Sequence, residues 1–281
     1  MKQYFIIILL LGAILLSGCF NNKEAPHRPV TAESLEQAVE LKQSVERIKL
    51  TGQKIGDLPS DLIGMPKLSI LLLRGSELKS LDVLASLNKL ETLDISATGL
   101  KELPRCLAGI ETLRQLYMAD NQLTELSFEI GQIKGVEYLN LDRNQLTSLD
   151  SALGSCIKMR WLRLNDNKLT AVPDSINSMK QLQRIYLAKN QLKSVPSALK
   201  DLPLLEDIDL SGNPVTEFPE WLSRLPKLRQ INLDNCKISK LPDDLSGLGG
   251  LETISLLRCP ISKAEKERIR LALPDQAHVA F

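Results

Sequence analysis

The sequence predicts an α/β solenoid, in which short parallel strands stack into one sheet and irregular or short helical segments return the chain along the other side. Three observations predict this fold class. Similar segments recur about every 23 residues through most of the 281-residue chain. Each segment carries alternating leucines, as in a strand with one buried face. The core must be aliphatic, since 43% of the residues are hydrophobic and only 4% are aromatic.

The first 18 residues are expected to be a signal peptide. Lys2 provides a short positive segment, and residues 4–16 form an apolar stretch too short for a comfortable bilayer span. The stretch ends in the letters LSGC at residues 16–19, which resemble the lipobox of bacterial lipoproteins. The resemblance implies that Cys19 starts the mature chain and carries acyl groups that attach it to a membrane. An ordinary secretory signal or an uncleaved anchor is the alternative.

Residues 19–30 are expected to be a flexible tether between the lipid and the solenoid. They contain two prolines and show no apolar period. Phe20 follows the lipobox cysteine, where some lipoproteins retained at the inner membrane carry aspartate. This difference weakly favours the outer membrane of a bacterial envelope.

Residues 31–44 are expected to form a helix that caps the first repeat, because an uncapped solenoid end would expose leucine. Ser34 is the expected N-cap, with Gln37 three residues further on. Leu35, Ala38 and Val39 then form an apolar helical stripe.

Residues 45–262 are expected to form about ten stacked repeats, because the template LxxLxLxxNxLxxLPxxLxxLxx recurs throughout this range. The repeats open at Val45, Leu68, Leu90, Leu113, Val136, Met159, Leu182, Leu205, Leu228 and Leu251. The LxxLxL segment predicts a short strand with its leucines buried. A leucine–proline pair follows in most repeats, where proline suits a return segment that needs no backbone donor.

The ninth position of the repeat is expected to form an inward ladder of amides that satisfy the backbone as the chain leaves each strand. In the central repeats it is occupied by Asn121, Asn144, Asn167, Asn190 and Asn213. Elsewhere small or polar residues take its place and should make weaker rungs: Gln53, Ser76, Thr98, Cys236 and Cys259.

This template resembles that of the leucine-rich repeat family, specifically its bacterial 23-residue type. The resemblance implies a right-handed, curved solenoid with the parallel sheet on the concave face. It also implies a binding role, since many partners in this family are proteins, although the fold alone does not fix the ligand.

Residues 263–281 are expected to cap the other end. The segment SKAEKERIRLALPD predicts an amphipathic helix, with Ile269, Leu271 and Leu273 as candidate packing residues, and the final AHVAF predicts a short strand.

The sequence favours neither catalysis nor a cofactor. Its two histidines, His27 and His278, lie near no plausible metal or nucleophile cluster, and no phosphate-binding loop appears. The net charge of +1 gives no electrostatic argument for nucleic acid. Cys236 and Cys259 occupy adjacent rungs, about 5 Å apart by strand spacing, so a disulfide is possible, although two reduced thiols are favoured.

The outward residues of the strands, at repeat positions 3 and 5, are the candidate binding surface. All three tyrosines beyond the signal peptide lie in these two rows, with one of the two tryptophans and interleaved arginines. We define these residues as the aromatic patch: Tyr117, Tyr138, Trp161, Arg163, Arg184 and Tyr186. Tyrosine, tryptophan and arginine dominate many interfaces. The same aromatics also favour strands and could simply stiffen the sheet.

These observations together predict a membrane-anchored, non-catalytic module that binds a protein or peptide through the aromatic patch. Binding of carbohydrate or cell wall is one alternative, because aromatic rings also suit the faces of sugars. A structural scaffold of the envelope without a defined ligand is the other.

Overall fold

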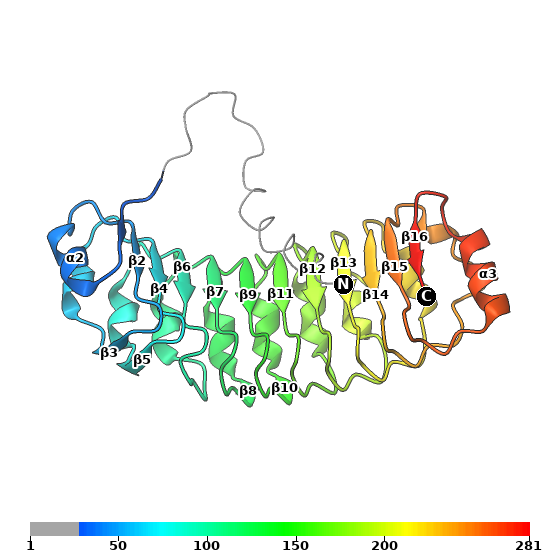
Figure 1. Cartoon of the computed structure of the whole chain (residues 1–281), viewed down its shortest axis with the longest axis horizontal. Coiled ribbons are helices and arrows are strands. Elements are labelled where there is room, and N and C mark those ends of the chain that lie inside the picture. Colours follow the sequence, from blue (N-terminus) through cyan, green and yellow to red (C-terminus); the bar gives the residue numbers. More distant parts are fainter. Residues whose placement is uncertain (1–27) are drawn as a thin grey trace, which may run out of the picture.

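A twelve-stranded parallel sheet runs along the computed structural model, which describes residues 28–281 (Figure 1). Cys19, the signal segment and most of the predicted tether lie outside the described residues. The strands, in their order across the sheet, are β1 (Thr31–Ala32), β2 (Arg47–Lys49), β4 (Ile70–Leu72), β6 (Thr92–Asp94), β7 (Gln115–Tyr117), β9 (Tyr138–Asn140), β11 (Trp161–Arg163), β12 (Arg184–Tyr186), β13 (Asp207–Asp209), β14 (Gln230–Asn232), β15 (Thr253–Ser255) and β16 (His278–Ala280).

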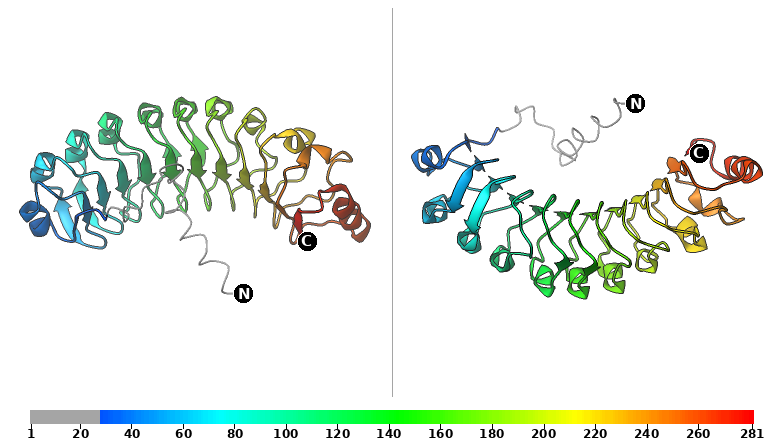
Figure 2. Two further views of the ribbon diagram at one scale, coloured as in Figure 1. Left: turned by 90° about the horizontal axis from the view of Figure 1, so that it is seen from above. Right: turned by 60° about the horizontal axis from the view of Figure 1, so that its bottom comes forward.

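The register of the sheet follows the repeat read from the sequence. Trp161 pairs with Arg184 and, on its other side, with Tyr138. In each central strand the middle residue is buried, while the two flanking residues are partly exposed. Because strand side chains alternate between faces, this pattern places one leucine or isoleucine in the core and two side chains on the opposite face of the sheet. That face is the concave side of the solenoid (Figure 2). The predicted parallel-sheet solenoid is therefore confirmed.

The convex side consists of 3-10 helices, which stack behind the sheet (Figure 2). They are η1 (Ser60–Gly64), η2 (Asp82–Ser86), η3 (Arg105–Gly109), η4 (Phe128–Gln132), η5 (Ser151–Ser155), η6 (Asp174–Ser178), η7 (Ser197–Leu199), η8 (Glu220–Arg224) and η9 (Ser246–Leu248). Proline precedes several of them in extended conformation, as at Pro59 and Pro173, and its fixed φ suits the entry to a turn.

Two small parallel sheets lie between the main sheet and the 3-10 helices. One pairs β3 (Lys54–Asp57) with β5 (Glu77–Ser80), and the other pairs β8 (Glu125–Leu126) with β10 (Ser148–Leu149). They extend the stacking of neighbouring repeats beyond the concave strands.

The N-terminal helix is shorter than predicted for residues 31–44. Thr31–Ala32 instead forms strand β1, because it pairs with β2, and the helix α2 covers only Leu35–Glu40. Ser34 is the N-cap as expected: its hydroxyl accepts a hydrogen bond from the Gln37 amide at 3.1 Å, while the Gln37 side chain accepts one from the Glu33 amide.

The C-terminal helix α3 (Lys263–Ala272) begins after Ser262, and β16 then adds the predicted last strand. Ile269 and Leu273 are buried, but the expectation that Leu271 also packs is wrong, since it is 80% exposed. Residues four apart share a helix face, whereas the residue midway between them points away from that face.

The asparagines of the ninth position bind the backbone of two adjacent repeats. Asn167 illustrates the arrangement: its Nδ2 donates to the Leu141 and Leu164 carbonyls, and its Oδ1 accepts from the Leu146 amide, all at 3.0–3.1 Å. Asn121, Asn144, Asn190 and Asn213 make the corresponding bonds. Each amide thus connects consecutive turns of the solenoid in a part of the core that water does not reach.

The smaller substitutes keep only part of this bonding. The Ser76 hydroxyl donates to the Leu50 carbonyl, and the Cys236 thiol donates to the Leu210 carbonyl. Each of these bonds reaches the preceding repeat, and neither side chain makes the other bonds of asparagine. Cys259 donates similarly to Leu233. Both cysteines are free thiols, so the disulfide that their spacing would permit is not present.

Position 8 of every repeat, from Gly52 to Arg258, lies in the left-handed backbone region, where the chain turns sharply out of the strand. Glycine takes this position in three repeats, but the others use L-residues: Ala97, Asp120, Arg143, Asp166, Lys189, Asn235 and Arg258. The repeat template in the sequence does not reveal this requirement, because most of these residues are not glycine or asparagine.

Candidate binding surface on the concave face

The six residues of the aromatic patch lie on β7, β9, β11 and β12, which are consecutive in the sheet. All six are partly exposed. Three strand steps of about 4.8 Å give the patch a length of roughly 15 Å along the solenoid. The structure therefore brings the sequence-predicted residues together on one continuous part of the concave face.

A first line of contacts crosses all four strands. The rings of Tyr117 and Tyr138 are tilted, with centroids 4.8 Å apart, and Tyr138 meets Trp161 edge-on at 5.7 Å. The Arg184 guanidinium carbon lies 4.6 Å from the centre of the Trp161 ring, in a cation–π contact. Each ring is held in place by its neighbours.

A second line of contacts lies beside the first and begins in the core. Asp142 has a side chain only 2% exposed and binds Arg163 through Nη2 at 2.6 Å and Nε at 2.8 Å. Arg163 lies over the Tyr186 ring at 5.1 Å, and the Tyr186 hydroxyl donates to Asp207 at 2.7 Å. The positive charge of Arg163 is therefore neutralised within the chain.

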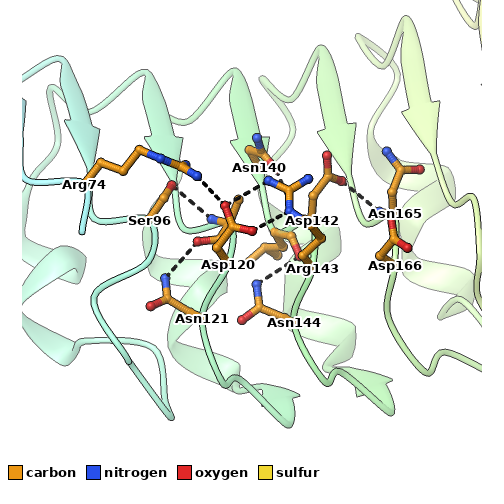
Figure 3. A network of polar contacts seen from close by, with 12 residues as sticks. Arg74, Ser96, Asp120, Asn121, Asn140, Asp142, Arg143, Asn144, Asn165 and Asp166 are labelled. Atoms are coloured by element: carbon orange, nitrogen blue, oxygen red, sulfur yellow. Dashed lines mark hydrogen bonds and ion pairs between the residues drawn. The ribbon is translucent and has the colours of Figure 1, made fainter. Parts of the chain in front are cut away.

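Side-chain oxygens also bind the backbone amide at position 7 of each repeat from the third to the tenth. In some repeats the oxygen comes from position 5 of the same repeat, as in the bond from the Asp142 amide to Asn140. In the others it comes from position 7 of the preceding repeat, as in the bonds from the Asn165 amide to Asp142 and from the Ala188 amide to Asn165 (Figure 3).

The source of this oxygen decides which residues at position 5 are not bound to the backbone. Four residues that the sequence places in the outward row bind their own backbone instead: Asp94, Asn140, Asp209 and Asn232. Tyr117, Arg163 and Tyr186 occur where Ser96, Asp142 and Asn165 of the preceding repeats supply the oxygen. The scaffold therefore does not need the tyrosines or arginine at these positions.

Burial sets the protonation of the patch. It raises the pKa values of Tyr117, Tyr138 and Tyr186, so their hydroxyls stay neutral and can donate hydrogen bonds. Burial also raises the pKa of Asp207 and of Asp209, because each carboxylate is largely removed from water. Asp207 is partly compensated by the hydrogen bond from Tyr186.

A row of alternating charges follows the patch at the turn out of the strands. Asp120 binds both Arg74 and Arg143, and Lys189 lies 3.1 Å from Asp166 (Figure 3). The hydrogen bond from Arg143, followed by that from Arg74, lowers the pKa of Asp120 to about 2 despite partial burial. These charged side chains bind one another, so they are less available to a partner than the residues of the aromatic patch.

Residues 28–281 contain neither a candidate metal centre nor a candidate membrane-spanning helix. This part of the chain contains no group of histidine, cysteine and acidic residues that could hold a metal ion. No helix within it is long and apolar enough to cross a membrane. An open depression lined by Lys54, Glu77 and Thr98 beside the β3–β5 sheet contains no patch residue.

The parallel sheet, the 3-10 returns and the asparagine ladder define a leucine-rich repeat solenoid. The family described as "Leucine rich repeat" matches residues 157–215, and "Leucine Rich repeats (2 copies)" matches residues 203–247. Neither description indicates an enzyme. None of the curated proteins compared matches the sequence significantly.

Solved structures share the same fold. An LRR protein of Leptospira interrogans is 24% identical, with a TM-score of 0.57 over 88% of this chain and 74% of that one. An internalin, InlF, of Listeria monocytogenes is 22% identical, with a TM-score of 0.73 over 88% and 70%. The plant peptide hormone receptor RGFR1, solved in complex with RGF2, is 18% identical, with a TM-score of 0.63 over 94% of this chain and 49% of the receptor.

Proposed function

We propose that this chain is a non-catalytic module that binds a protein or peptide through its aromatic patch. The observation that carries the proposal concerns the fourth, sixth and seventh repeats. There the residue at position 5 does not bind the backbone amide of position 7. Ser96, Asp142 and Asn165 take over that bonding, so the scaffold gives no reason for Tyr117, Arg163 and Tyr186. Large, pre-positioned aromatic residues bind partners at a small cost in side-chain entropy.

A peptide or protein fits this surface better than a sugar does. A sugar platform needs an open aromatic face, whereas Arg184 covers a face of Trp161 and Tyr138 packs against the same ring. The RGFR1–RGF2 complex shows that a solenoid of this fold class can hold a peptide. The charged and aromatic character of the patch favours a partner with both polar and apolar side chains.

The partner-binding residues can be tested in a pull-down with the full chain carrying Cys19→Ser, which keeps it unlipidated. We expect Trp161→Ala/Tyr186→Ala to lose the partners that the parent chain recovers, because the double variant removes one ring from each of the two lines of contacts. Phe128→Ala is the matched control, since Phe128 is an aromatic residue 59% exposed on the convex side. Recovery of the same partners by all three proteins would exclude the aromatic patch as the site.

We also propose that acylation of Cys19 anchors the module to a bacterial envelope, at the outer rather than the inner membrane. The support for this is the LSGC sequence behind an apolar stretch of signal-peptide length. Cells fed labelled palmitate should label the parent chain and a Cys106→Ser control but not Cys19→Ser. Equal labelling of the Cys19→Ser variant would show that this cysteine is not the lipid attachment site.

A further inference from the structure

Arg184 and Asp207 face each other on neighbouring strands but do not form an ion pair. They are register partners in β12 and β13, a position at which opposite charges commonly bind each other. Arg184 instead lies over Trp161, one strand further back, and Asp207 accepts the hydroxyl of Tyr186. The two charges are therefore held apart by aromatic neighbours.

Arg184 differs from the other arginine of the patch in what its donors bind. Arg163 gives two nitrogens to Asp142. Within the described residues Arg184 forms no hydrogen bond or ion pair, and its guanidinium lies over the Trp161 ring. A guanidinium that lies over a ring contacts it through its own face and keeps its N–H groups at its edges, so they remain available to a carboxylate.

The repeat after Arg184 carries three acidic side chains, and the charge of Arg184 acts on one of them, Asp207. Glu206, Asp207 and Asp209 form no ion pair in the part of the chain that the structure describes. Arg229, beside the next strand of the sheet, pairs with Glu252 instead. The patch thus ends in a positive group and a negative group that lie near each other without forming an ion pair.

We propose that the patch selects an extended peptide with an acidic side chain on Arg184 and a basic side chain on Asp207, which deepens the proposed function and rests on it. Alternate residues of an extended peptide lie on one face, about 6.6 Å apart, which falls between one and two strand spacings of about 4.8 Å. The Arg184 guanidinium leans back over Trp161 on β11, so it lies more than one spacing from Asp207 on β13. The ligand therefore carries its acidic and basic residues two positions apart. Apolar residues beyond the acid lie over Tyr138 and Tyr117.

The proposal can be tested with a library of random linear dodecapeptides displayed on phage. The target is the full chain carrying Cys19→Ser, and the same chain with Trp161→Ala/Tyr186→Ala is used for counterselection. We expect the enriched peptides to carry Asp or Glu two positions from Lys or Arg. A selected peptide is then synthesised in three forms: unchanged, with its acid replaced by the amide, and with its base replaced by glutamine.

Arg184→Gln should weaken the unchanged peptide about tenfold and the amide peptide less than twofold, since a charge-assisted bond is lost only in the first case. Asp207→Asn should show the same selectivity for the basic side chain. Arg229→Gln removes an arginine that lies just before β14 and has an internal partner, and it should leave all three affinities unchanged.

Enriched peptides without paired charges would overturn this inference and leave the aromatic patch as a peptide site. Equal losses of the unchanged and amide peptides on Arg184→Gln would overturn it in the same way. Failure of any peptide to enrich over the counterselected variant would reject this inference and the peptide-binding function together.

Discussion

Asn167→Ala is expected to lower the free energy of unfolding by about 3–5 kcal/mol. It leaves the buried Leu146 amide without a partner, at roughly 1–3 kcal/mol, and removes one of the two donors from the Leu141 and Leu164 carbonyls, at about 1 kcal/mol each. Asn167 bonds the carbonyls of Leu141, Leu164 and Asn165 and the amide of Leu146. Alanine replaces none of these bonds and opens a space between two repeats. Urea unfolding followed by circular dichroism measures the loss.

The chain itself supplies the graded comparison for this prediction. Asn167→Ser and Asn167→Cys should lose less than Asn167→Ala, because Ser76 and Cys236 keep the cross-repeat bond at equivalent positions. Asn177→Ala, on the exposed surface of η6, is the control and should change stability by less than about 0.5 kcal/mol. A loss for Asn167→Ala no larger than that of the control would mean that the ladder does not hold the repeats together.

The fold was predictable from the sequence because each repeat restates the same information. The alternating leucines and the ninth-position asparagines recur in register, so an error in one repeat is corrected by the next. The two ends lack this redundancy. There the predicted helix at residues 31–44 included strand β1, and Leu271 was placed in the core, although it is exposed.

The membership of the aromatic patch was predictable from alternation alone, but its scaffold partners were not. Asp142 looks like any surface acid in the sequence, yet it binds both Arg163 and the Asn165 amide. That role couples position 7 of one repeat to positions 5 and 7 of the next. A template that reads each position separately cannot show such a coupling, whereas comparing positions 5 and 7 in successive repeats can.

Added side-chain volume between the 3-10 helices of the convex side should also lower the free energy of unfolding. Gly154 lies in η5, where a Cβ would come 2.4 Å from the Ser175 carbonyl oxygen and 2.6 Å from the Ser175 Cβ in η6. Both are contacts with the backbone or its first side-chain atom, so neither can rotate away. Gly154→Ala should therefore force the two 3-10 helices apart and cost about 2–3 kcal/mol of unfolding free energy.

Gly109→Ala is the control for Gly154→Ala, since Gly109 also lies in a 3-10 helix, η3, one position later in the repeat, and faces the preceding repeat. There an added Cβ would come no closer than 3.6 Å, to the Ala85 carbonyl oxygen, which is an ordinary contact. Gly109→Ala should be neutral or raise stability by about 0.5 kcal/mol, because alanine restricts the unfolded chain. The difference in urea midpoint between the two variants measures the cost of the close contact between η5 and η6. Equal midpoints would show that the spacing between η5 and η6 adjusts freely and that the convex side does not limit the curvature of the concave surface.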